Sequence, residues 1–484
     1  MPSPSSTPPT ADTERPPPSR FVRLVPVLTG VTALVCLLGW VQKQPCARNG
    51  FDFVKTTTYA CYTDVYPLFY GRGFADGKLA YFDSFPGDDI RYIEYPVVSG
   101  FFMQVVTWLS QPFGKDGQGM VFFNITAVLL ALLAIVAVLA TAYVAGRRSL
   151  RVGLMIALSP ALLLSAYINW DLLAVALSAL AVLAWSKRRP ALAGALLGLA
   201  IAAKFYPLLF LGPLFLLCAR SGQWRAFGRL FTGTVVAWLA VNLPIMIFAW
   251  DGWVQFYRFS QNRGIDWGSI FFYLQDHGLE SADEHLNLLG TGTFVLLAGG
   301  IAVLAWAAPR RPRLAQLLFL VVVAFMLSNK VWSPQFALWL LPLAVLARPK
   351  LPAFVVWQIG EIIYFFGIWW YLLSVKVEDE PSDLGATVSA VLSLEAPPGG
   401  ISDDVYYLAL FARFLTVLAM AILVVVDILR PSLDLVRRDG DDDPAGGVLD
   451  GAPDRFSLSA LRARKTKAPD VPRGTSETLA ENPA

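Results

Sequence analysis

The stretch that decides the fold runs from Lys187 to Arg220 and reads KRRPALAGALLGLAIAAKFYPLLFLGPLFLLCAR. A basic cluster stands at each end, and the residues between the clusters are almost all apolar. As a single span, this stretch would place its two basic clusters on opposite sides of a membrane, against the tendency of Lys and Arg to stay inside. As two short spans that turn at Lys204–Pro207, it keeps both clusters on one side. The sequence therefore predicts a helical hairpin with an outer turn.

The rest of the chain repeats this pattern. Further apolar runs occur on both sides of the hairpin, and several are shorter than the ~20 residues that cross ~30 Å of hydrocarbon. All the runs, the hairpin included, are 21–41, 120–145, 152–168, 170–185, 190–204, 206–219, 230–250, 288–308, 314–328, 334–347, 352–373 and 406–428. With the N-terminus inside, every short basic cluster falls on the inner side: Arg147–Arg151, Lys187–Arg189, Arg220–Arg229, Arg310–Arg313 and Arg348–Lys350. We therefore expect an all-α polytopic membrane protein of about 12 transmembrane helices with both termini cytoplasmic.

The composition agrees with a membrane environment. Of the 484 residues, 56% are hydrophobic and 15% are charged, whereas soluble proteins carry about 25% charged residues. This excludes a set of water-soluble domains, and the net charge of +3 is too small to suggest a nucleic-acid partner. There is also no Gly-x-x-x-x-Gly-Lys phosphate loop for a nucleotide.

Three regions are expected along the chain. Residues 1–20 are Pro/Ser-rich and predict a disordered cytoplasmic tail, residues 21–430 form the membrane domain, and residues 431–484 predict a second disordered cytoplasmic tail with a solvated acidic run at Asp439–Asp443. The expected outer loops are 42–119, 251–287 and 374–405. In the first, 97–113 is apolar but too short to cross, and it predicts an amphipathic or re-entrant helix at the interface.

Costly polar residues gather on the outer side. An ionisable group at membrane depth costs about 2.5–3.5 kcal/mol by insertion scales. The inner turns carry almost only Arg and Lys, which topology explains, but the outer turns have a mixed chemistry that topology does not require. The residues concerned are Asp64, Glu94, Asp171, Lys204 and Lys330. We therefore expect the active site on the extracytoplasmic side.

The order of the outer motifs resembles a known family. Asp64 is followed by Tyr66, by a Gly-rich turn and by Glu94-Tyr95-Pro96; three later turns read Asn169-Trp170-Asp171, Ala203-Lys204-Phe205-Tyr206-Pro207 and Asn329-Lys330-Val331-Trp332-Ser333-Pro334-Gln335. This order resembles the GT-C membrane glycosyltransferases, most closely the polyprenyl-phosphate-mannose-dependent mannosyltransferases of glycosyltransferase family 87.

The resemblance implies a GT-C-like fold and a hexosyltransferase of the plasma membrane and cell envelope. It implies a polyprenyl-phosphate sugar, with mannose as the sugar, as donor substrate, inversion by a single displacement, no metal ion and no other cofactor. It also carries the role of general base onto Asp64. The acceptor stays open between a glycolipid, a polysaccharide and a protein, and membrane lipids are the remaining partners.

The physical demands of such a transfer fit the residues present. A carboxylate that accepts the proton of a hydroxyl nucleophile is typically worth ~10²–10⁴ in rate, and a departing phosphate needs cations or hydrogen-bond donors. The expected substrate-binding residues are Glu94, Tyr66, Asn169, Asp171, Lys204, Tyr206, Lys330, Gln335 and His277. Cys46 and Cys61 share the first outer loop and are candidates for a disulfide.

Structural explanations compete with several of these roles. Asp64 is also placed to cap a helix, Asp171 to be stabilised at a helix start, and Lys204 and Lys330 to extend to lipid headgroups. Glu94 is equally suited to orienting its loop. A transporter or flippase of lipid-linked sugars is the alternative function, although such proteins usually place their ionisable groups near the bilayer midplane.

Overall fold

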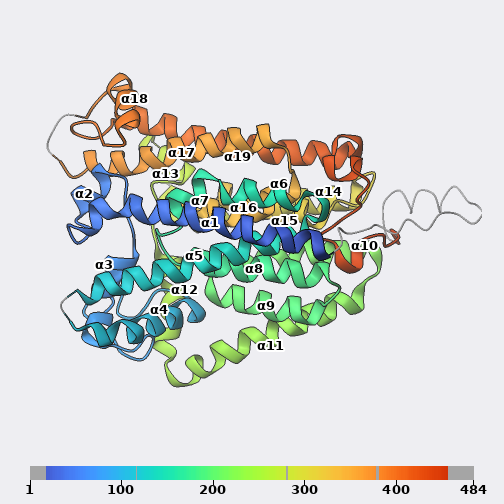
Figure 1. Ribbon diagram of the computed structural model, residues 1–484, viewed down its shortest axis with the longest axis horizontal. Helices are drawn as coiled ribbons and strands as arrows, with labels where there is room; N and C mark the ends of the chain where they lie inside the picture. Colours follow the sequence, from blue (N-terminus) through green and yellow to red (C-terminus); the bar gives the residue numbers. More distant parts are fainter. Residues whose placement is uncertain (1–17, 116, 279–281, 378–380, 456–484) are drawn as a thin grey trace, which may run out of the picture.

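The computed structural model describes residues 18–115, 117–278, 282–377 and 381–455, and these residues form an α-helical bundle (Figure 1). Within these ranges the only β pairing is an isolated bridge between Ser382 and Ile401. The all-α prediction is therefore confirmed. Of the predicted disordered tails, residues 1–17 and 456–484 lie outside the described ranges, whereas residues 18–20, also predicted to be disordered, begin the first helix, α1 (Pro18–Ala47).

Among the described residues, six helices are long and apolar enough to cross a membrane. They are α1 (Pro18–Ala47), α5 (Gln118–Val144), α11 (Trp224–Phe248), α14 (Ala282–Ala307), α17 (Leu351–Ser374) and α19 (Asp403–Leu429). Each coincides with one of the twelve predicted apolar runs.

The other six predicted runs form shorter or broken helices. Five give α8 (Asp171–Ser186), α9 (Pro190–Ala203), η4 with α10 (Tyr206–Phe210 and Leu211–Ser221), α15 (Leu314–Ser328) and η5 with α16 (Pro334–Phe336 and Ala337–Ala347). The run at 152–168 is broken into α6 (Ser149–Ala157) and α7 (Pro160–Ser165), because Ser159 caps α7 and Pro160 has no amide hydrogen for a continuous helix. Length alone therefore supports six crossings, and the predicted hairpin is two short helices that meet at Lys204.

Glycines set the position of α9. A Cβ on Gly194 would lie 2.0 Å from the Leu230 carbonyl oxygen, and one on Gly198 would lie 2.4 Å from the Thr234 carbonyl oxygen. Small residues four apart let two helix backbones approach closely. The close approach to α11 fixes α9, and with it the place where α9 ends.

The connections at one end of the bundle carry additional small helices. These are α2 (Phe53–Thr58), α3 (Val65–Gly71), η1 (Phe74–Asp76), α4 (Val97–Ser110), η2 (Gln111–Phe113), α12 (Trp250–Asn262), α13 (Ile270–Asp276) and α18 (Leu384–Ser393). Cys46 and Cys61 form a disulfide with Cα atoms 6.2 Å apart, as the sequence analysis suggested. The predicted helix at 97–113 is present as α4 and η2.

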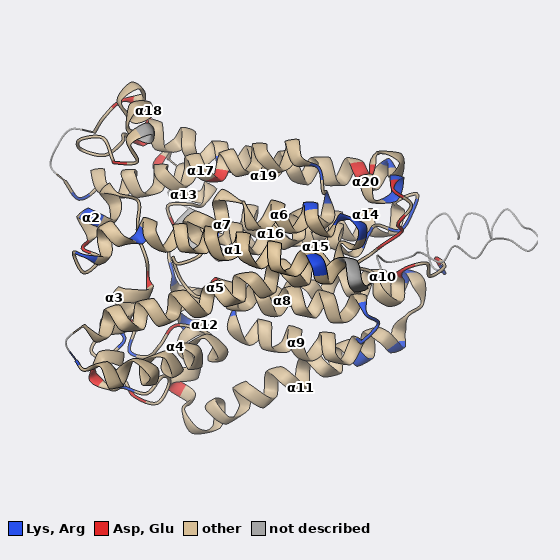
Figure 2. Ribbon diagram, in the orientation of Figure 1, with Lys and Arg blue, Asp and Glu red and all other residues tan. Residues whose placement is uncertain are grey.

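The opposite end is rich in Lys and Arg (Figure 2). It contains η3 (Gly146–Arg148) and the C-terminal strap, which we define as residues 431–455 and which forms η6 (Pro431–Leu433), α20 (Leu435–Arg438) and η7 (Gly447–Leu449). The prediction of a disordered tail from residue 431 is wrong for this segment. Its aspartates pair with arginines from other connections, and Val436, Ala445 and Leu449 are buried.

Candidate active site

Asp64 lies where the first connection docks onto the turn before α8. Thr63 Oγ1 donates to the Tyr167 carbonyl oxygen (2.6 Å) and the Asp64 amide donates to that of Ile168 (2.7 Å). The buried Lys43 Nζ of α1 donates to the Tyr62 carbonyl oxygen (2.9 Å). Three anchors therefore fix the backbone on both sides of Asp64.

The Asp64 side chain does not cap a helix, although Asp64 stands at the N-cap position of α3. Its Oδ1 instead accepts a hydrogen bond of 2.6 Å from Tyr62 Oη, and the Tyr62 ring stacks on Trp369 at 4.5 Å between centroids. Burial raises the pKa of Asp64 to about 6, against the opposing effects of the Tyr62 hydrogen bond and of the charges of Lys204 and Arg263. Asp64 is thus a carboxylate that ionises near neutral pH, as a general base must.

Asp171 and Lys204 form an ion pair between two helix ends. Asp171 is the first residue of α8 and is buried, and Lys204 follows the last residue of α9. Lys204 Nζ lies 3.0 Å from Asp171 Oδ1, which also accepts a hydrogen bond from Trp339 Nε1 (3.0 Å). The second oxygen, Oδ2, is buried and has no hydrogen-bond partner among the described residues. Because a buried acceptor without a donor is costly, this oxygen is suited to a ligand hydroxyl.

Lys204 sits among aromatic rings. Its Nζ lies 5.6 Å from the ring centroid of Tyr95 and 6.0 Å from that of Phe336. Ser99 Oγ of α4 donates to the carbonyl oxygen of Ala203 (2.7 Å), so α4 holds the end of α9. The Lys204 side chain is partly exposed, and its ammonium group directs one of its three hydrogen-bond donors to Asp171.

Two other predicted residues complete the framework of this region. Asn169 Oδ1 accepts from the Asp171 amide (3.0 Å) and shapes the turn before α8. Tyr206 is buried, with its ring stacked on Trp339 at 4.4 Å and its hydroxyl 3.4 Å from Ser178 Oγ. Asn169 thus binds the backbone of Asp171, and Tyr206 packs on the Trp339 indole that donates to Asp171.

Glu94 makes a bidentate ion pair with Arg72. Arg72 Nε and Nη2 lie 2.6 and 2.5 Å from the two Glu94 carboxylate oxygens. Of the two roles left open by the sequence, this geometry favours orientation of the loop. Tyr66 packs on Phe51 and Tyr70, at 5.3 and 5.2 Å between centroids.

The turn before α16 carries Lys330 and Gln335. Lys330 Nζ donates to the Gln261 carbonyl oxygen (2.8 Å), and burial lowers the pKa of Lys330. Gln335 is buried, and its Oε1 has no hydrogen-bond partner within the described part of the chain. Both residues thus stand in the turn between α15 and α16 at the end of the bundle that holds Lys204.

Arg413 clamps this turn and was missed by the sequence analysis. It is fully buried in α19, and its Nη1 and Nη2 donate to the carbonyl oxygens of Trp332 (2.7 Å) and Ser333 (2.9 Å). Its Nε lies 3.1 Å from Oε2 of Glu361 in α17. A charged residue inside an apolar helix was the available signal, because such residues are rare without a function or a partner.

The segment after α12 brings a second cation to Asp64. Arg263 is exposed and pairs with Asp266 (2.7 Å), and the Asp266 amide donates to the Lys330 carbonyl oxygen (2.9 Å).

His277 is exposed at the end of α13, where its ring stacks on Tyr273 and its Nδ1 lies 2.9 Å from the Tyr273 carbonyl oxygen. The structure shows contacts of His277 with the aromatic residues of α13 and α19.

No group of three or more His, Cys, Asp or Glu side chains in the described ranges is arranged to hold a metal ion. The acidic neighbours Asp88 and Asp89 are exposed.

Comparison with known proteins gives one family. Residues 92–329 match glycosyltransferase family 87; this range contains Glu94, Asp171 and Lys204, and it begins after Asp64. Among solved structures, the chain is similar to the oligosaccharyltransferase of Archaeoglobus fulgidus in its apo form, at 14% sequence identity and a TM-score of 0.34. The similarity covers 92% of this chain and 58% of the archaeal chain. No curated protein matches the sequence.

Proposed function

Because this chain is a polytopic helical protein related to glycosyltransferase family 87, we propose that it transfers a sugar, mannose, from a polyprenyl-phosphate donor to an outer-leaflet or cell-envelope acceptor. The end of the bundle that holds Asp64 faces outside in this proposal, because the opposite end holds the Arg clusters. The observation that supports it best is the carboxylate of Asp64, which is oriented by Tyr62 and neighboured by the cations Lys204 and Arg263.

The proposed reaction is a single displacement with inversion. The acceptor hydroxyl oxygen forms a bond to the anomeric carbon, its proton passes to the Asp64 carboxylate, and the bond from that carbon to the phosphate oxygen breaks. The bonding electrons leave with the lipid phosphate, whose growing charge requires fixed positive partners.

Lys204, Lys330 and Arg263 each have hydrogen-bond donors left for that phosphate. Lys204 Nζ directs one donor to Asp171 and Lys330 Nζ directs one to a carbonyl oxygen, so each ammonium retains further hydrogens. Arg263 is exposed and keeps donors beyond those on Asp266. The unpartnered oxygens of Asp171 and Gln335 would accept sugar hydroxyls.

The test compares Asp64→Asn with Asp88→Asn, which removes an exposed carboxylate from the same loop. Purified protein in detergent is incubated with labelled polyprenyl-phosphate mannose and with glycolipid, polysaccharide or peptide acceptors, with and without chelator. We expect Asp64→Asn to transfer sugar about 10²–10⁴-fold more slowly than wild type while it still binds the donor. Asp88→Asn should keep the wild-type rate.

Two outcomes would change the assignment. Transfer by Asp64→Asn at the wild-type rate would remove Asp64 as the base. Label that crosses a sealed vesicle without entering any product would favour the transport of lipid-linked sugars instead.

A further inference from the structure

The C-terminal strap contacts all five basic connections that the sequence places on one side. Arg148 lies between α5 and α6, Arg220 lies in the last turn of α10, and Arg310–Arg313 joins α14 to α15. At each of these places, arginines bind strap aspartates. Lys350, between α16 and α17, donates to the Leu433 carbonyl oxygen (2.7 Å).

The fifth contact is through the backbone. Gly447 has φ +61° and lies so close to the end of α8 that a Cβ would stand 2.0 Å from the Trp185 carbonyl oxygen. Only glycine fits such an approach at a positive φ. The strap is therefore packed against the last turn of α8, where the connection to α9 begins.

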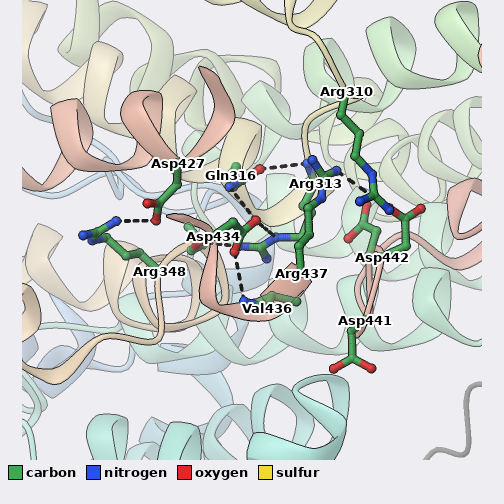
Figure 3. Close-up of polar contacts among 12 residues, drawn as sticks. Arg310, Arg313, Gln316, Arg348, Asp427, Asp434, Val436, Arg437, Asp441 and Asp442 are labelled. Carbon is green, nitrogen blue, oxygen red and sulfur yellow. Dashed lines mark hydrogen bonds and ion pairs between the residues drawn. The ribbon is translucent and has the colours of Figure 1, made fainter. Parts of the chain in front are cut away.

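Four of the arginines, Arg148, Arg220, Arg311 and Arg313, are buried and bind the strap through several hydrogen bonds each, whereas the Asp454, Asp441 and Asp439 side chains are partly exposed. Asp434 receives Nε (2.8 Å) and Nη2 (3.1 Å) of Arg313 and Nε2 of Gln316 (3.2 Å), and both Asp434 and Arg313 are almost inaccessible to solvent (Figure 3). Asp454 joins two connections, because its Oδ2 accepts from Arg220 (2.7 Å) and its Oδ1 from Arg311 (2.9 Å).

Arg148 adds a third buried anchor. It donates to Asp441 Oδ2 from Nη1 (2.8 Å) and Nη2 (2.9 Å), to Asp439 from Nε (3.1 Å), and to the Val436 carbonyl oxygen (3.0 Å). Breaking one partner of such a pair leaves an uncompensated buried charge, which is strongly destabilising. These contacts differ in kind from exposed surface pairs, which contribute little.

We propose that the C-terminal strap is an internal latch, which takes the place of anionic lipid headgroups on the arginines of the basic end and locks its five connections together. Arginines at a membrane surface ordinarily bind phosphate headgroups. Here the aspartates satisfy them within the chain, and the high effective concentration of a tethered partner favours the strap over free lipid. The inference is independent of the proposed sugar transfer, because it concerns the end of the bundle opposite Asp64.

The latch is tested in the full-length chain with a buried reporter. Leu449 is fully buried in the strap, Cys36 is buried in α1 and Cys46 is bonded to Cys61. Cys218 lies in α10, which packs on η7, so it is replaced by Ala in every background and Leu449→Cys provides one conditional thiol. Its labelling by N-ethylmaleimide is followed in vesicles of phosphatidylcholine and of phosphatidylglycerol, in three backgrounds: otherwise unchanged, Asp434→Asn with Asp454→Asn, and Asp88→Asn as the control at the opposite end.

We expect slow labelling in both lipids for the unchanged and control backgrounds. Labelling should be at least about 10-fold faster when Asp434 and Asp454 are replaced, since local opening exposes Leu449→Cys. Phosphatidylglycerol should raise the melting temperature of that double variant by more than that of the unchanged chain, because the variant frees Arg220, Arg311 and Arg313 in addition to the arginines that are already exposed.

Three results would overturn the latch. Equal labelling in all backgrounds would mean that the aspartates do not hold the strap. Fast labelling of the unchanged background in phosphatidylglycerol alone would mean that headgroups displace it. Equal stabilisation of variant and unchanged chain by phosphatidylglycerol would mean that the strap does not mask the arginines.

Discussion

Tyr62 holds the carboxylate of Asp64. Its hydroxyl donates a 2.6 Å hydrogen bond to Asp64 Oδ1, its ring stacks on Trp369, and its carbonyl oxygen accepts from Lys43. The tyrosine is thus fixed at both ends, and the carboxylate can adopt few other orientations. In the proposed reaction, the other oxygen, Oδ2, accepts the proton of the incoming hydroxyl.

Replacement of Tyr62 by Phe should move the pH dependence of transfer. A general base acts when ionised, so the rate should rise with pH and level off above the pKa of Asp64, which burial raises to about 6. The Tyr62 hydrogen bond opposes that rise, so its removal should move the midpoint to higher pH. Rates measured between pH 4.5 and pH 9 (roughly the range that brackets such a midpoint) check this.

The plateau rate of Tyr62→Phe should also fall, since the carboxylate loses its fixed orientation while Phe preserves the stack on Trp369. An unchanged midpoint would show that Tyr62 does not control ionisation of the base.

The ion pair of Lys204 with Asp171 should be separable from the role of Lys204 toward substrate. Lys204→Met leaves a buried carboxylate with the Trp339 indole as its remaining donor, which should cost about 3–5 kcal/mol of stability. Adding Asp171→Asn removes the unpaired charge and keeps an acceptor for Trp339. The double variant should therefore regain most of the stability but not the transfer activity, as measured by thermal unfolding in detergent and by product formation.

A double variant as unstable as Lys204→Met would show that the two residues are not coupled. A double variant as active as wild type would show that Lys204 does not serve the phosphate.

The disulfide between Cys46 and Cys61 should stabilise the loop that carries Asp64. A bridge that closes a loop of 15 residues is worth about 3 kcal/mol in the chain-entropy account. We expect Cys46→Ser with Cys61→Ser to lower the free energy of unfolding by about this amount, which is measured as a lower melting temperature. Reducing agent should lower it for wild type and leave the double variant unaffected; equal sensitivity of the two would place the effect elsewhere.

The positions of Asp64, Asp171 and Lys204 could be predicted because each interrupts or borders an apolar run, where a charge is expensive. The structure brings two of them into direct contact and places the third within reach of their charges. That logic does not apply to His277, because a histidine in a long polar loop carries no such cost; the structure leaves it exposed, and its role toward substrate stays a prediction.

The partners of these residues could not be predicted. Whether Arg413 meets Glu361 depends on the rotation of α19 against α17, which the apolar pattern does not determine. The acidic run of the strap predicts self-repulsion and solvation unless the arginines that face the strap are known, and those lie in three separate connections. The sequence shows where a charged residue is costly, but it does not show which distant residue pairs with that charge.

Asp443 should make the strap less stable as pH rises. Its Oδ2 accepts from the Leu314 amide (2.8 Å), its Oδ1 has no hydrogen-bond partner in the described ranges, and burial raises its pKa to about 7 despite the charge of Arg313. The folded protein therefore retains a proton that the unfolded chain releases near pH 4. Stability should fall as pH rises from about 4 to about 7, because the unfolded state binds fewer protons there.

Asp443→Asn should remove this penalty. Asparagine cannot ionise, and its carbonyl oxygen still accepts from Leu314. We expect the variant to match wild type in thermal unfolding at about pH 4–5 and to exceed it by about 1–4 kcal/mol near pH 8, where the carboxylate is charged. A variant that is less stable than wild type by the same amount at both pH values would mean that the attraction of Arg313 for a charged Asp443 outweighs its burial.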